Sequence, residues 1–333
     1  MKVLFIGGTG NISTECSKLA LDKGMELYLL NRGTTKKPGL EEAIVIQADI
    51  HKQDQVEEAT RGMEFDVVAN FIAFTPGDIQ RDIQLFGGKT KQYIFISSAS
   101  AYQKPQSHWL ITESTPLANP YWDYSRNKIA CEDLLMKAYR DAGFPVTIVR
   151  PSHTYDTAIP VAVGSWEDYT IIDRMKKGLP VIVHGDGSSL WTITHSRDFA
   201  KGFVGLLGHQ QALGQAFHIT SDEVLNWNQI YQAVAEAAGA EANILHVSSD
   251  FICQVADELG QSWMRGNLLG DKAVSAIFDN SKIKSFVPGF VASTPFRQGI
   301  RQTIQWFEED TVRMKISKAN QDLMDAVVAK YTF

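Results

Sequence analysis

Short apolar runs alternate with amphipathic stretches through the first 150 residues. The runs at residues 2–6, 26–30, 43–47, 65–70, 92–97 and 145–150 have the length and composition of strands buried on both faces. Apolar residues with helical spacing lie between them, for example at 53–60 and 78–86. This alternation predicts βαβ units and an α/β fold with a doubly wound parallel sheet. Ligands of such sheets bind at the carboxyl ends of the strands.

The pattern changes after Pro151. We expect a loop over residues 152–166, a short helix at 169–177 and a short strand at 181–184. An apolar helix is predicted at 199–207. Further helices are predicted at 228–238, which is amphipathic, and across an apolar stripe from Phe296 to Phe307. Residues 216–220 are a candidate seventh strand of the first sheet. We therefore predict a first domain over 1–151, to which 191–220 returns, and a smaller interleaved α/β domain mainly over 152–333.

A glycine-rich turn follows the first apolar run. Gly7 and Gly10 occupy the first two positions of a G-x-x-G-x-x-G pattern, and Ser13 stands at the third, before a helical pattern that ends near Gly24. Glycine permits a tight turn here and lets backbone N–H groups approach a pyrophosphate at the helix N-terminus. With a strand before it and a helix after it, the turn predicts a dinucleotide site in a Rossmann-type domain. The alternative is a glycine-rich turn in another kind of α/β protein.

Composition narrows the expected partners and compartment. The chain has 333 residues, a net charge of −6, 44% hydrophobic and 21% charged residues, which is ordinary for a globular protein. No block of Lys or Arg is long enough to follow a phosphate backbone, so nucleic acid is not the expected partner. Cys16, Cys131 and Cys253 are scattered without metal-ligand spacing, which favours a reduced cytoplasm and predicts no metal site. Without an apolar run of bilayer length, no membrane partner is expected.

Tyr124 and Lys128 lie four residues apart in a helical pattern, which places both on one helix face, one turn apart. An ammonium beside a phenol favours the phenolate and moves the tyrosine pKa from about 10 toward neutrality. Such a tyrosine can exchange a proton with a substrate hydroxyl while hydride moves to or from a nicotinamide. The same pair also occurs on solvated helix faces. Ser98, which follows the fifth strand, is expected at the same sheet edge.

These segments, in this order, resemble the extended short-chain dehydrogenase/reductase family, in its NAD-dependent epimerase/dehydratase group. The resemblance covers nearly the whole chain. Beyond the glycine turn, Ser98 and the Tyr124/Lys128 pair, it rests on Asp-Ile at 49–50, Asp-Val-Val-Ala-Asn at 66–70, Arg-Pro at 150–151, His-Ser-Arg-Asp at 195–198 and Phe-Asp-Asn-Ser-Lys at 278–282.

The resemblance implies a role for each matching position. Ser98 would hydrogen-bond the reacting oxygen, Tyr124 would be the general acid/base, and Lys128 would hold the nicotinamide ribose and lower the pKa of the tyrosine. NAD(P) would contact the glycine turn and the ends of the second, third and fourth strands, at Gly7, Thr9, Gly10, Asn11, Ile12, Asn31, Arg32, Asp49, Ile50, Asn70, Phe71, Ile72 and Ala73. His195 and Asp198 are expected to be structural. A homodimer through the helix of Tyr124 is also implied.

The end of the second strand bears on cofactor choice. NAD-selective proteins usually offer a carboxylate to the ribose 2′-OH about twenty residues after the glycines. Asn31 and Arg32 stand there instead. Arg32 can pair with a 2′-phosphate, with Lys36 and Lys37 nearby, so NADP is the favoured cofactor. The alternative is that Arg32 is a solvent-exposed loop residue.

Departures from the family pattern bear on the reaction and the substrate. Ala99 and Ser100 stand where dehydratases of the family carry an acidic pair, so dehydration is not expected. Trp191 and Leu268 stand where nucleotide-sugar enzymes place arginines, the usual side chains for holding a diphosphate. Their loss makes a nucleotide-diphosphate sugar a less favoured substrate.

Aromatic residues of the second half point the same way. We expect Trp166, Tyr169 and Trp263 to face the cleft, which would suit a less charged substrate bound by apolar contact and a few hydrogen bonds. The alternative is that these aromatics are core residues. In that case Arg150, Arg174 or Arg265 would hold a diphosphate from another direction.

The sequence therefore predicts an NAD(P)-dependent oxidoreductase with a small-molecule substrate in the cytoplasm. It would transfer hydride at a secondary alcohol or ketone, as a reductase or through a transient keto intermediate in an epimerisation. A nucleotide-sugar epimerase is the alternative within the family. A non-catalytic dinucleotide- or RNA-binding relative is the alternative of another class, and the presence of Ser98, Tyr124 and Lys128 weighs against it.

Overall fold

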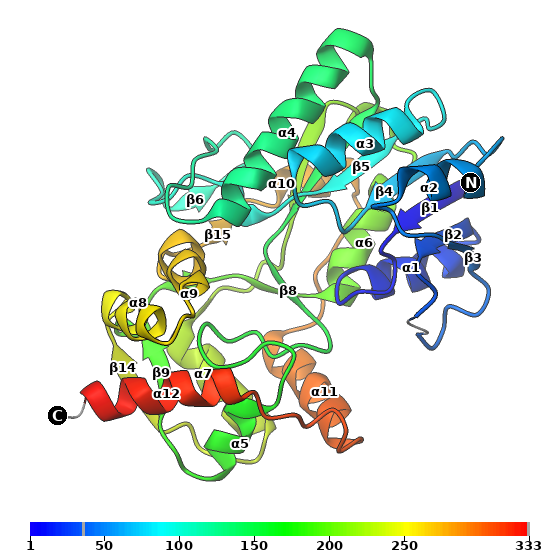
Figure 1. The fold of residues 1–333 in the computed structure, drawn as a ribbon. Helices are drawn as coiled ribbons and strands as arrows, with labels where there is room; N and C mark the ends of the chain where they lie inside the picture. The colour runs from blue at the N-terminus through cyan, green and yellow to red at the C-terminus, as the bar shows by residue number, and fades with distance from the viewer. Residues whose placement is uncertain (35–36, 332–333) are drawn as a thin grey trace.

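A seven-stranded parallel sheet forms the centre of the first half of the protein (Figure 1). The structure is a computed structural model that describes residues 1–34 and 37–331. The strands are β1 (Lys2–Ile6), β2 (Glu26–Asn31), β3 (Ile44–Gln47), β4 (Val67–Asn70), β5 (Tyr93–Ile96), β7 (Val146–Pro151) and β12 (Gln215–Ile219). They lie in the order β12-β7-β5-β4-β1-β2-β3, and each neighbouring pair is parallel. The predicted sheet is confirmed, including a seventh strand near 216–220.

Helices cover both faces of this sheet (Figure 1). One face carries α1 (Ser13–Asp22) and α6 (Ser196–Leu206), and the other carries α2 (Gln53–Ala59), α3 (Pro76–Phe86) and α4 (Asp123–Ala142). Val3 and Phe5 of β1 belong to the core under α1 and α6, whereas Leu4 and Ile6 belong to the core under α3 and α4. Because alternate residues of a strand face opposite sides, a strand covered on both faces is apolar throughout.

The second half of the chain surrounds another hydrophobic core (Figure 1). Its helices are α5 (Thr170–Lys176), α7 (Trp227–Ala237), α8 (Ser249–Glu258), α9 (Trp263–Asn267), the π-helix η3 (Leu268–Lys272), α11 (Phe296–Glu308) and α12 (Lys318–Tyr331). The helix α10 (Ser281–Phe286) packs instead against α6 and β12 of the first half's core. The strands around the second core pair two by two: β9 (Val181–His184) with β14 (Ile244–Val247), β8 (His153–Tyr155) with β11 (Ile193–His195), β10 (Leu190–Trp191) with β13 (Leu225–Asn226), and β15 (Ile277–Phe278) with β6 (Leu110–Ile111). Short 3₁₀ turns lie at η1 (Ala99–Ala101) and η2 (Gln210–Ala212).

Most predicted elements of this half are present, with exceptions. The apolar stripe of α11 is buried as expected, and the capping box of Asn226 and Gln229 starts α7. The expected loop at 152–166 instead contains β8, which is only three residues long. The helices α8, α9, α10 and α12 were not predicted. Of α12, only Leu323, Met324 and Val327 are buried, so its apolar face is too narrow for a clear periodic signal.

The chain crosses back to the first sheet within residues 191–220. The helix α6 packs against α1, and β12 pairs with β7, with Phe217 beside Val149. Strand β12 therefore extends the edge of the sheet opposite β3. That 1–151 and 152–333 are separate domains in other respects stays a prediction.

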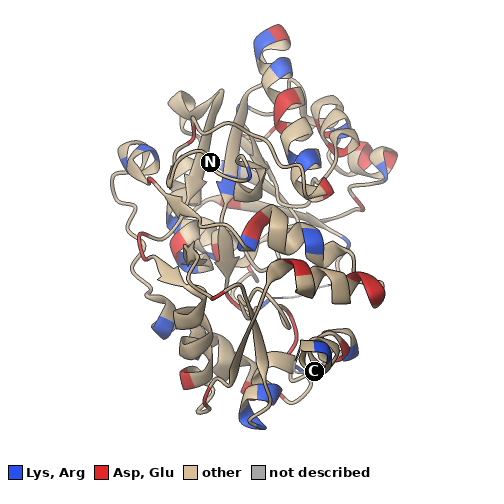
Figure 2. Cartoon of the chain, turned by 90° about the vertical axis from the view of Figure 1, so that its left-hand side faces the viewer, with Lys and Arg blue, Asp and Glu red and all other residues tan. Residues whose placement is uncertain are grey.

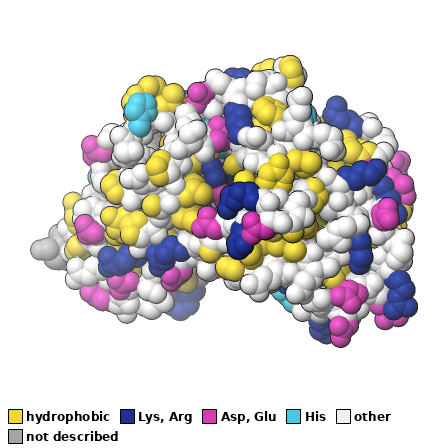
Figure 3. All heavy atoms as spheres, turned by 90° about the horizontal axis from the view of Figure 1, so that it is seen from above, with side chains coloured by type: hydrophobic (Ala, Val, Ile, Leu, Met, Phe, Trp, Pro, Cys, Tyr) yellow, Lys and Arg dark blue, Asp and Glu magenta, His cyan; other side chains and the backbone are white. Residues whose placement is uncertain are grey.

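Charges of both signs are interspersed over the surface. Basic and acidic residues occur along the same helices in Figure 2, and side chains of both charges lie among hydrophobic ones on the face shown in Figure 3. None of the helices within the described ranges combines the length and the apolar composition needed to cross a bilayer.

Candidate active site

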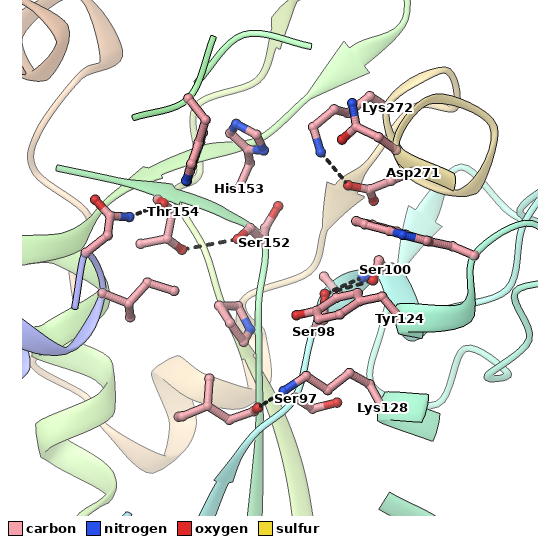
Figure 4. A pocket seen from close by; sticks show the side chains of 18 of the residues that line it. Ser97, Ser98, Ser100, Tyr124, Lys128, Ser152, His153, Thr154, Asp271 and Lys272 are labelled. Carbon is pink, nitrogen blue, oxygen red and sulfur yellow. Dashed lines mark hydrogen bonds and ion pairs between the residues drawn. The ribbon is translucent and has the colours of Figure 1, made fainter. Parts of the chain in front are cut away.

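A cavity of about 690 Å³ lies where the sheet meets the second half of the chain. The first half contributes the glycine turn, the segment after β5 and the first turns of α4. The second half contributes the segment from Pro151 to Thr154, the loop before α5, and residues around η3 (Figure 4). The cavity therefore lies at the carboxyl edge of the sheet, where parallel sheets bind ligands.

Another cavity, of about 410 Å³, continues from the same glycines. Gly7, Gly10 and Ile72 line both cavities. The smaller cavity is also lined by Thr9, Leu30, Asn31, Arg32, Thr34, Ala48, Asp49, Ile50 and His51. Two spaces that meet at a helix N-terminus fit a dinucleotide, whose two halves are joined by a pyrophosphate.

The glycine turn has the geometry that this ligand needs. Gly7 has φ +79°, and a Cβ there would lie 2.6 Å from Ile72 Cγ2. The Ser13 hydroxyl donates to the Gly7 carbonyl at 2.6 Å and accepts from the Gly10 N–H at 2.8 Å, so the serine closes the turn. The α1 N-terminus has no side-chain cap, and although the Thr14 N–H donates to the Gly10 carbonyl at 3.0 Å, the positive end of the helix faces this turn and suits an anion. The residues present therefore fit a dinucleotide cofactor.

The Asn11 side chain ties this turn to the second half of the chain. Its Nδ2 donates to the Thr154 carbonyl at 2.9 Å, and its Oδ1 accepts from the Asp156 N–H at 3.0 Å. Asn11 thus lines the larger cavity and also holds β8 beside the glycine turn.

Ser98, Tyr124 and Lys128 line the larger cavity together (Figure 4). Ser98 follows β5, and its hydroxyl lies 2.8 Å from that of Ser100. The neighbouring Ser97 donates instead to the buried Glu132 at 2.5 Å. Tyr124 lies in the first turn of α4, and the Lys128 Nζ is 5.7 Å from the centre of its ring. The three side chains of the predicted catalytic set are therefore neighbours.

Lys128 is almost fully buried and has a defined position. Its ammonium donates to the Ala73 carbonyl at 2.7 Å and to the Ile96 carbonyl at 2.8 Å. Burial lowers the pKa of Lys128 to about 8. Both carbonyls follow or end a sheet strand, so the lysine links α4 to the edges of β4 and β5.

Burial also raises the pKa of Tyr124 to about 12, although its hydrogen bond with Ser98 lowers it. The expectation that Lys128 moves this pKa toward neutrality is therefore wrong for this structure. The lysine ammonium points to two carbonyls, and desolvation of the phenol dominates. The phenol is consequently protonated at neutral pH and can donate a proton.

Most of the cofactor residues predicted from the sequence line one of the two cavities. These are Gly7, Thr9, Gly10, Asn11, Ile12, Asn31, Arg32, Asp49, Ile50, Phe71, Ile72, Tyr124 and Lys128. Asn70 and Ala73 are described but line neither. The Asn70 side chain accepts from the Ile72 N–H at 2.8 Å and shapes the turn after β4, and Ala73 contributes its carbonyl to Lys128. Lys36 lies outside the described residues, and Lys37 is not among the residues that line the cavity of Arg32.

The three arginines considered as alternative diphosphate ligands are paired elsewhere. Arg150 is buried against Glu132 at 2.6 Å, Arg174 pairs with Asp325 at 2.5 Å, and Arg265 pairs with Asp257 at 2.7 Å. None of the three is among the described residues that line either cavity.

The expected aromatic lining is partly present. Trp166, Trp191 and Trp263 line the larger cavity. Tyr169 does not: it is buried against Phe307, and its hydroxyl donates to Glu308.

His195 and Asp198 are structural, as predicted, because His195 accepts from the Arg197 N–H at the start of α6 and Asp198 accepts from Lys201 and the Thr294 N–H.

Five ionisable residues of the larger cavity were missed by the sequence reasoning. They are Lys104, His153, Asp168, Asp271 and Lys272. Lys104 follows the Ser98–Tyr102 segment, and Asp271 comes soon after Leu268, so both lie close to positions that had been singled out. A charged residue near an expected sheet edge was the available signal, but neither short segment has a pattern that places it.

Comparisons with known proteins agree with this geometry. The model of the NAD dependent epimerase/dehydratase family matches residues 3–220. The chain is 21% identical over 258 residues to 2′-dehydrokanamycin reductase of Streptomyces kanamyceticus, covering 78% of this chain and 72% of that protein. It is 24% identical to the chloroplast stem-loop binding protein of 41 kDa b of Arabidopsis thaliana, covering 74% of this chain and 65% of that protein.

Among solved structures, the UDP-glucose 4-epimerase of Thermus thermophilus in complex with NAD has a TM-score of 0.69 and 20% identity. The match covers 92% of this chain and 99% of that one. The fold and site thus define an α/β protein of the extended short-chain dehydrogenase/reductase type. The chain belongs to the NAD-dependent epimerase/dehydratase family.

Proposed function

We propose that the protein is an NAD(P)-dependent oxidoreductase that reduces a ketone, or oxidises the corresponding secondary alcohol, with Ser98, Tyr124 and Lys128 as its catalytic set. The observation that carries the proposal is that these three side chains line one cavity, which continues to an uncapped helix N-terminus behind a glycine turn. Proton donor and cofactor site thus open onto the same space.

Each of the three residues has a distinct task in this proposal. Ser98 orients the reacting oxygen by a hydrogen bond, and Tyr124 transfers a proton to or from that oxygen. Lys128, anchored by the carbonyls of Ala73 and Ile96, contacts the cofactor ribose. When bound, the nicotinamide supplies or accepts the hydride.

The protonated state of Tyr124 favours the reductive direction. Burial raises its pKa to about 12, so at neutral pH the side chain is an acid ready to protonate a developing alkoxide. Oxidation requires the phenolate, which is scarce until the pH approaches this pKa.

We further propose that NADP is preferred over NAD. Arg32 lines the smaller cavity at the end of β2, where a carboxylate would favour NAD. Its guanidinium can pair with a 2′-phosphate.

A nucleotide-sugar epimerase remains the second candidate, favoured by the family and by the fold shared with the T. thermophilus epimerase. The pairing of Arg150, Arg174 and Arg265 away from both cavities weighs against it. An RNA-binding role, as in the name of the chloroplast relative, finds less support because charges of both signs are interspersed (Figure 2). Homodimerisation through α4 and a cytoplasmic location stay predictions.

Tyr124→Phe tests the proposal. Ketones are screened with NADPH by its absorbance, and the variant is measured on any that are reduced. Loss of a general acid lowers the rate by roughly 10²–10⁴-fold, while NADPH binding, followed by its fluorescence, stays near the wild-type value. Tyr121→Phe is the control, because Tyr121 is 44% exposed and is not among the described residues that line the cavity. A Tyr124→Phe rate close to wild type would rule out this catalytic set.

A further inference from the structure

Two buried lysines and one aspartate form a cluster in the larger cavity. Lys104 is 3% exposed and Lys272 is 6% exposed, and both line the cavity with Asp271. The Lys272 ammonium donates to Asp271 Oδ2 at 2.9 Å, and the Lys104 Nζ lies 4.0 Å from Asp271 Oδ1. In Figure 4, Lys272 and Asp271 lie above the ring of Tyr124 and the Ser98 hydroxyl.

The cluster contains two ammonium groups and one carboxylate, so its net charge is positive by one. Asp271 makes its hydrogen bond with Lys272, whereas its 4.0 Å separation from Lys104 is too long for a hydrogen bond. No other polar contact of the Lys104 ammonium occurs among residues 1–34 and 37–331. A buried ammonium that is only weakly paired, at 4.0 Å from a carboxylate shared with another lysine, is costly. Burial accordingly lowers the pKa of Lys104, although Asp271 raises it.

Other ionisable groups of the cavity do not balance this charge. Burial, with a smaller contribution from Lys272, holds the pKa of His153 well below its usual range, so this imidazole is neutral. Asp168, which is hydrogen-bonded by the Thr170 N–H and by Asn320, contributes one negative charge. Lys128 contributes one positive charge at the catalytic end, so these two residues offset each other and the surplus positive charge of the cluster remains.

The surrounding structure holds the cluster in place. The Lys272 carbonyl lies within hydrogen-bonding distance of three side-chain nitrogens: Trp191 Nε1 at 3.1 Å, Trp227 Nε1 at 3.1 Å and His184 Nε2 at 2.9 Å. The Gly270 carbonyl accepts from Asn119 at 2.7 Å. These residues end a π-helical turn, a deviation from regular helix that is frequent at functional sites.

Aromatic surfaces lie next to the lysines. The Lys272 Nζ is 5.5 Å from the centre of the Trp191 ring. His153 packs edge-on against Trp166 at 4.8 Å, and its Nε2 is buried without a hydrogen-bond partner in the described part of the chain. A ligand here meets flat apolar walls and one fixed region of positive charge.

We propose that Lys104 and Lys272, set by Asp271, bind a single oxyanion of the substrate, and that the substrate is a ketone or secondary alcohol carrying one carboxylate. A single carboxylate carries the one negative charge needed to balance the surplus positive charge of the cluster. A diphosphate carries at least two negative charges. The inference deepens the proposed function, on which it rests for the assignment of the cavity to substrate.

Matched pairs of ligands test this inference without turnover. D-glucuronate is compared with D-glucuronamide, and mandelate with mandelamide, by calorimetric titration of the NADP-saturated protein. In each pair an anionic carboxylate is replaced by a neutral amide of nearly the same size, and the rest of the molecule is unchanged. A charge-assisted contact is worth about a tenfold to hundredfold gain in affinity. We expect the carboxylate to bind at least about tenfold more tightly than its amide in one pair or both.

Lysine variants connect the preference to the cluster. Lys104→Met and Lys272→Met are expected to reduce the ratio of carboxylate to amide affinity to less than about threefold. Each lysine supplies part of the charge-assisted contact, so its loss removes most of the preference. Asp271→Asn is expected to increase it, because the anion that neutralises Lys272 is lost. Lys137→Met is the control, since Lys137 is exposed on α4 and pairs with Asp141. If Lys104→Met does not fold, Lys104→Gln serves instead.

Three outcomes would overturn the inference. In the first, the amides bind as tightly as the carboxylates in both pairs. In the second, the preference for the carboxylate survives in both lysine variants, and the substitutions change only the unfolding temperature, as expected for structural residues. In the third, UDP-glucose binds more tightly than either carboxylate and loses that affinity in Lys104→Met, which makes the cluster a diphosphate site.

Failure of the proposed function gives a different result. Tyr124→Phe retains the carboxylate preference under this inference, because the phenol contacts the reacting oxygen rather than the acid group. A lysine-dependent preference without reduction of any ketone would refute the catalytic proposal and leave the binding site standing.

Discussion

The proposed cofactor end and the proposed substrate end of the larger cavity are built by different means. At the cofactor end, the turn from Gly7 to Ser13 is one continuous segment, and its chemistry lies in backbone N–H groups. At the substrate end, Lys104, His153 and Lys272 come from segments far apart in the chain, and the chemistry lies in their side chains. Both ends suit an anion, the first through a helix N-terminus and the second through fixed ammonium groups.

This difference determines which substitutions matter at each end. A backbone-built site is sensitive to an added Cβ or a changed φ angle, and it tolerates changes in nearby charges. A site built from side chains responds to the loss of one charge. Arg150 and Arg265 lie near the cavity but do not line it, so substitutions there test stability and not ligand binding.

The largest effect is expected for a charge that lies behind the cavity. Arg150→Met leaves the Glu132 carboxylate buried without its partner. We expect a loss of about 3–5 kcal/mol in the free energy of unfolding, measured by urea denaturation, as is usual when a buried pair is broken. Arg265→Ala is the comparison: its pair with Asp257 is about half exposed, so the expected loss is at most about 1 kcal/mol. Equal losses would show that the burial of the first pair does not matter.

The next effect tests the backbone-built end. Gly7→Ala places a Cβ 2.6 Å from Ile72 Cγ2 at a φ of +79°, in a residue that lines both cavities. Strain of about 1–3 kcal/mol is expected, and a distorted turn should weaken NADPH binding at least about tenfold. Gly24→Ala is matched in backbone, with φ +71°, but its Cβ meets nothing within 4 Å. If both variants bind NADPH equally well, the close approach at Gly7 has no role in cofactor binding.

A smaller effect is expected from a charge at the cofactor end. Arg32→Ala should weaken NADP binding by roughly tenfold, the value of one charge-assisted contact, and leave NAD binding unchanged. Calorimetric titration of both cofactors measures the ratio. Arg61→Ala, in an exposed turn after α2, controls for general charge effects. Unchanged NADP affinity in Arg32→Ala would remove the argument for NADP.

The smallest expected effect is a pH dependence of the free energy of unfolding, caused by Lys128, which lies between the two ends of the cavity. Lys128 has a folded pKa of about 8, below its unfolded value, so the unfolded chain binds more protons from about pH 8 to about pH 10.4. Burial of this charge therefore destabilises the protein below pH 8, and the penalty falls as the pH rises. From pH 7 to pH 9, wild type should gain about 1 kcal/mol relative to Lys128→Met.

Urea denaturation of both proteins at several pH values measures this difference, and the comparison removes the contributions of other titrating groups, including Lys104. A difference that stays constant from pH 7 to pH 9 would contradict a lowered pKa for Lys128.

The fold of the first half could be predicted because each of its elements carries its own signal. Strands such as β1 and β7 are apolar at every position, since helices cover both faces of the sheet. The glycine turn and the Tyr124/Lys128 spacing are likewise local patterns. Most residues that these patterns singled out line the two cavities, and Ser98, Tyr124 and Lys128 are neighbours there. That Ser13 closes the turn by its own hydrogen bonds was not predicted.

The substrate end had no such local signal. Lys104 lies in an irregular segment, and Asp271 and Lys272 end a π-turn, so no periodicity relates them to one another. Tyr169 was expected in the cleft and is in the core, because an aromatic residue satisfies either environment. The lowered pKa expected for Tyr124 was wrong because the pKa also depends on desolvation by all the groups that surround the phenol, which the local sequence does not show.

Local sequence patterns thus specified the sheet, its glycine turn and the helix that pairs Tyr124 with Lys128, since these depend on neighbours a few residues apart. Tertiary packing determined the partners of each arginine, the burial that sets the pKa values of Tyr124 and Lys128, and the meeting of Lys104 with Asp271. Those properties are sums over residues distant in sequence, and electrostatic energies in a protein interior depend on every group within several ångströms.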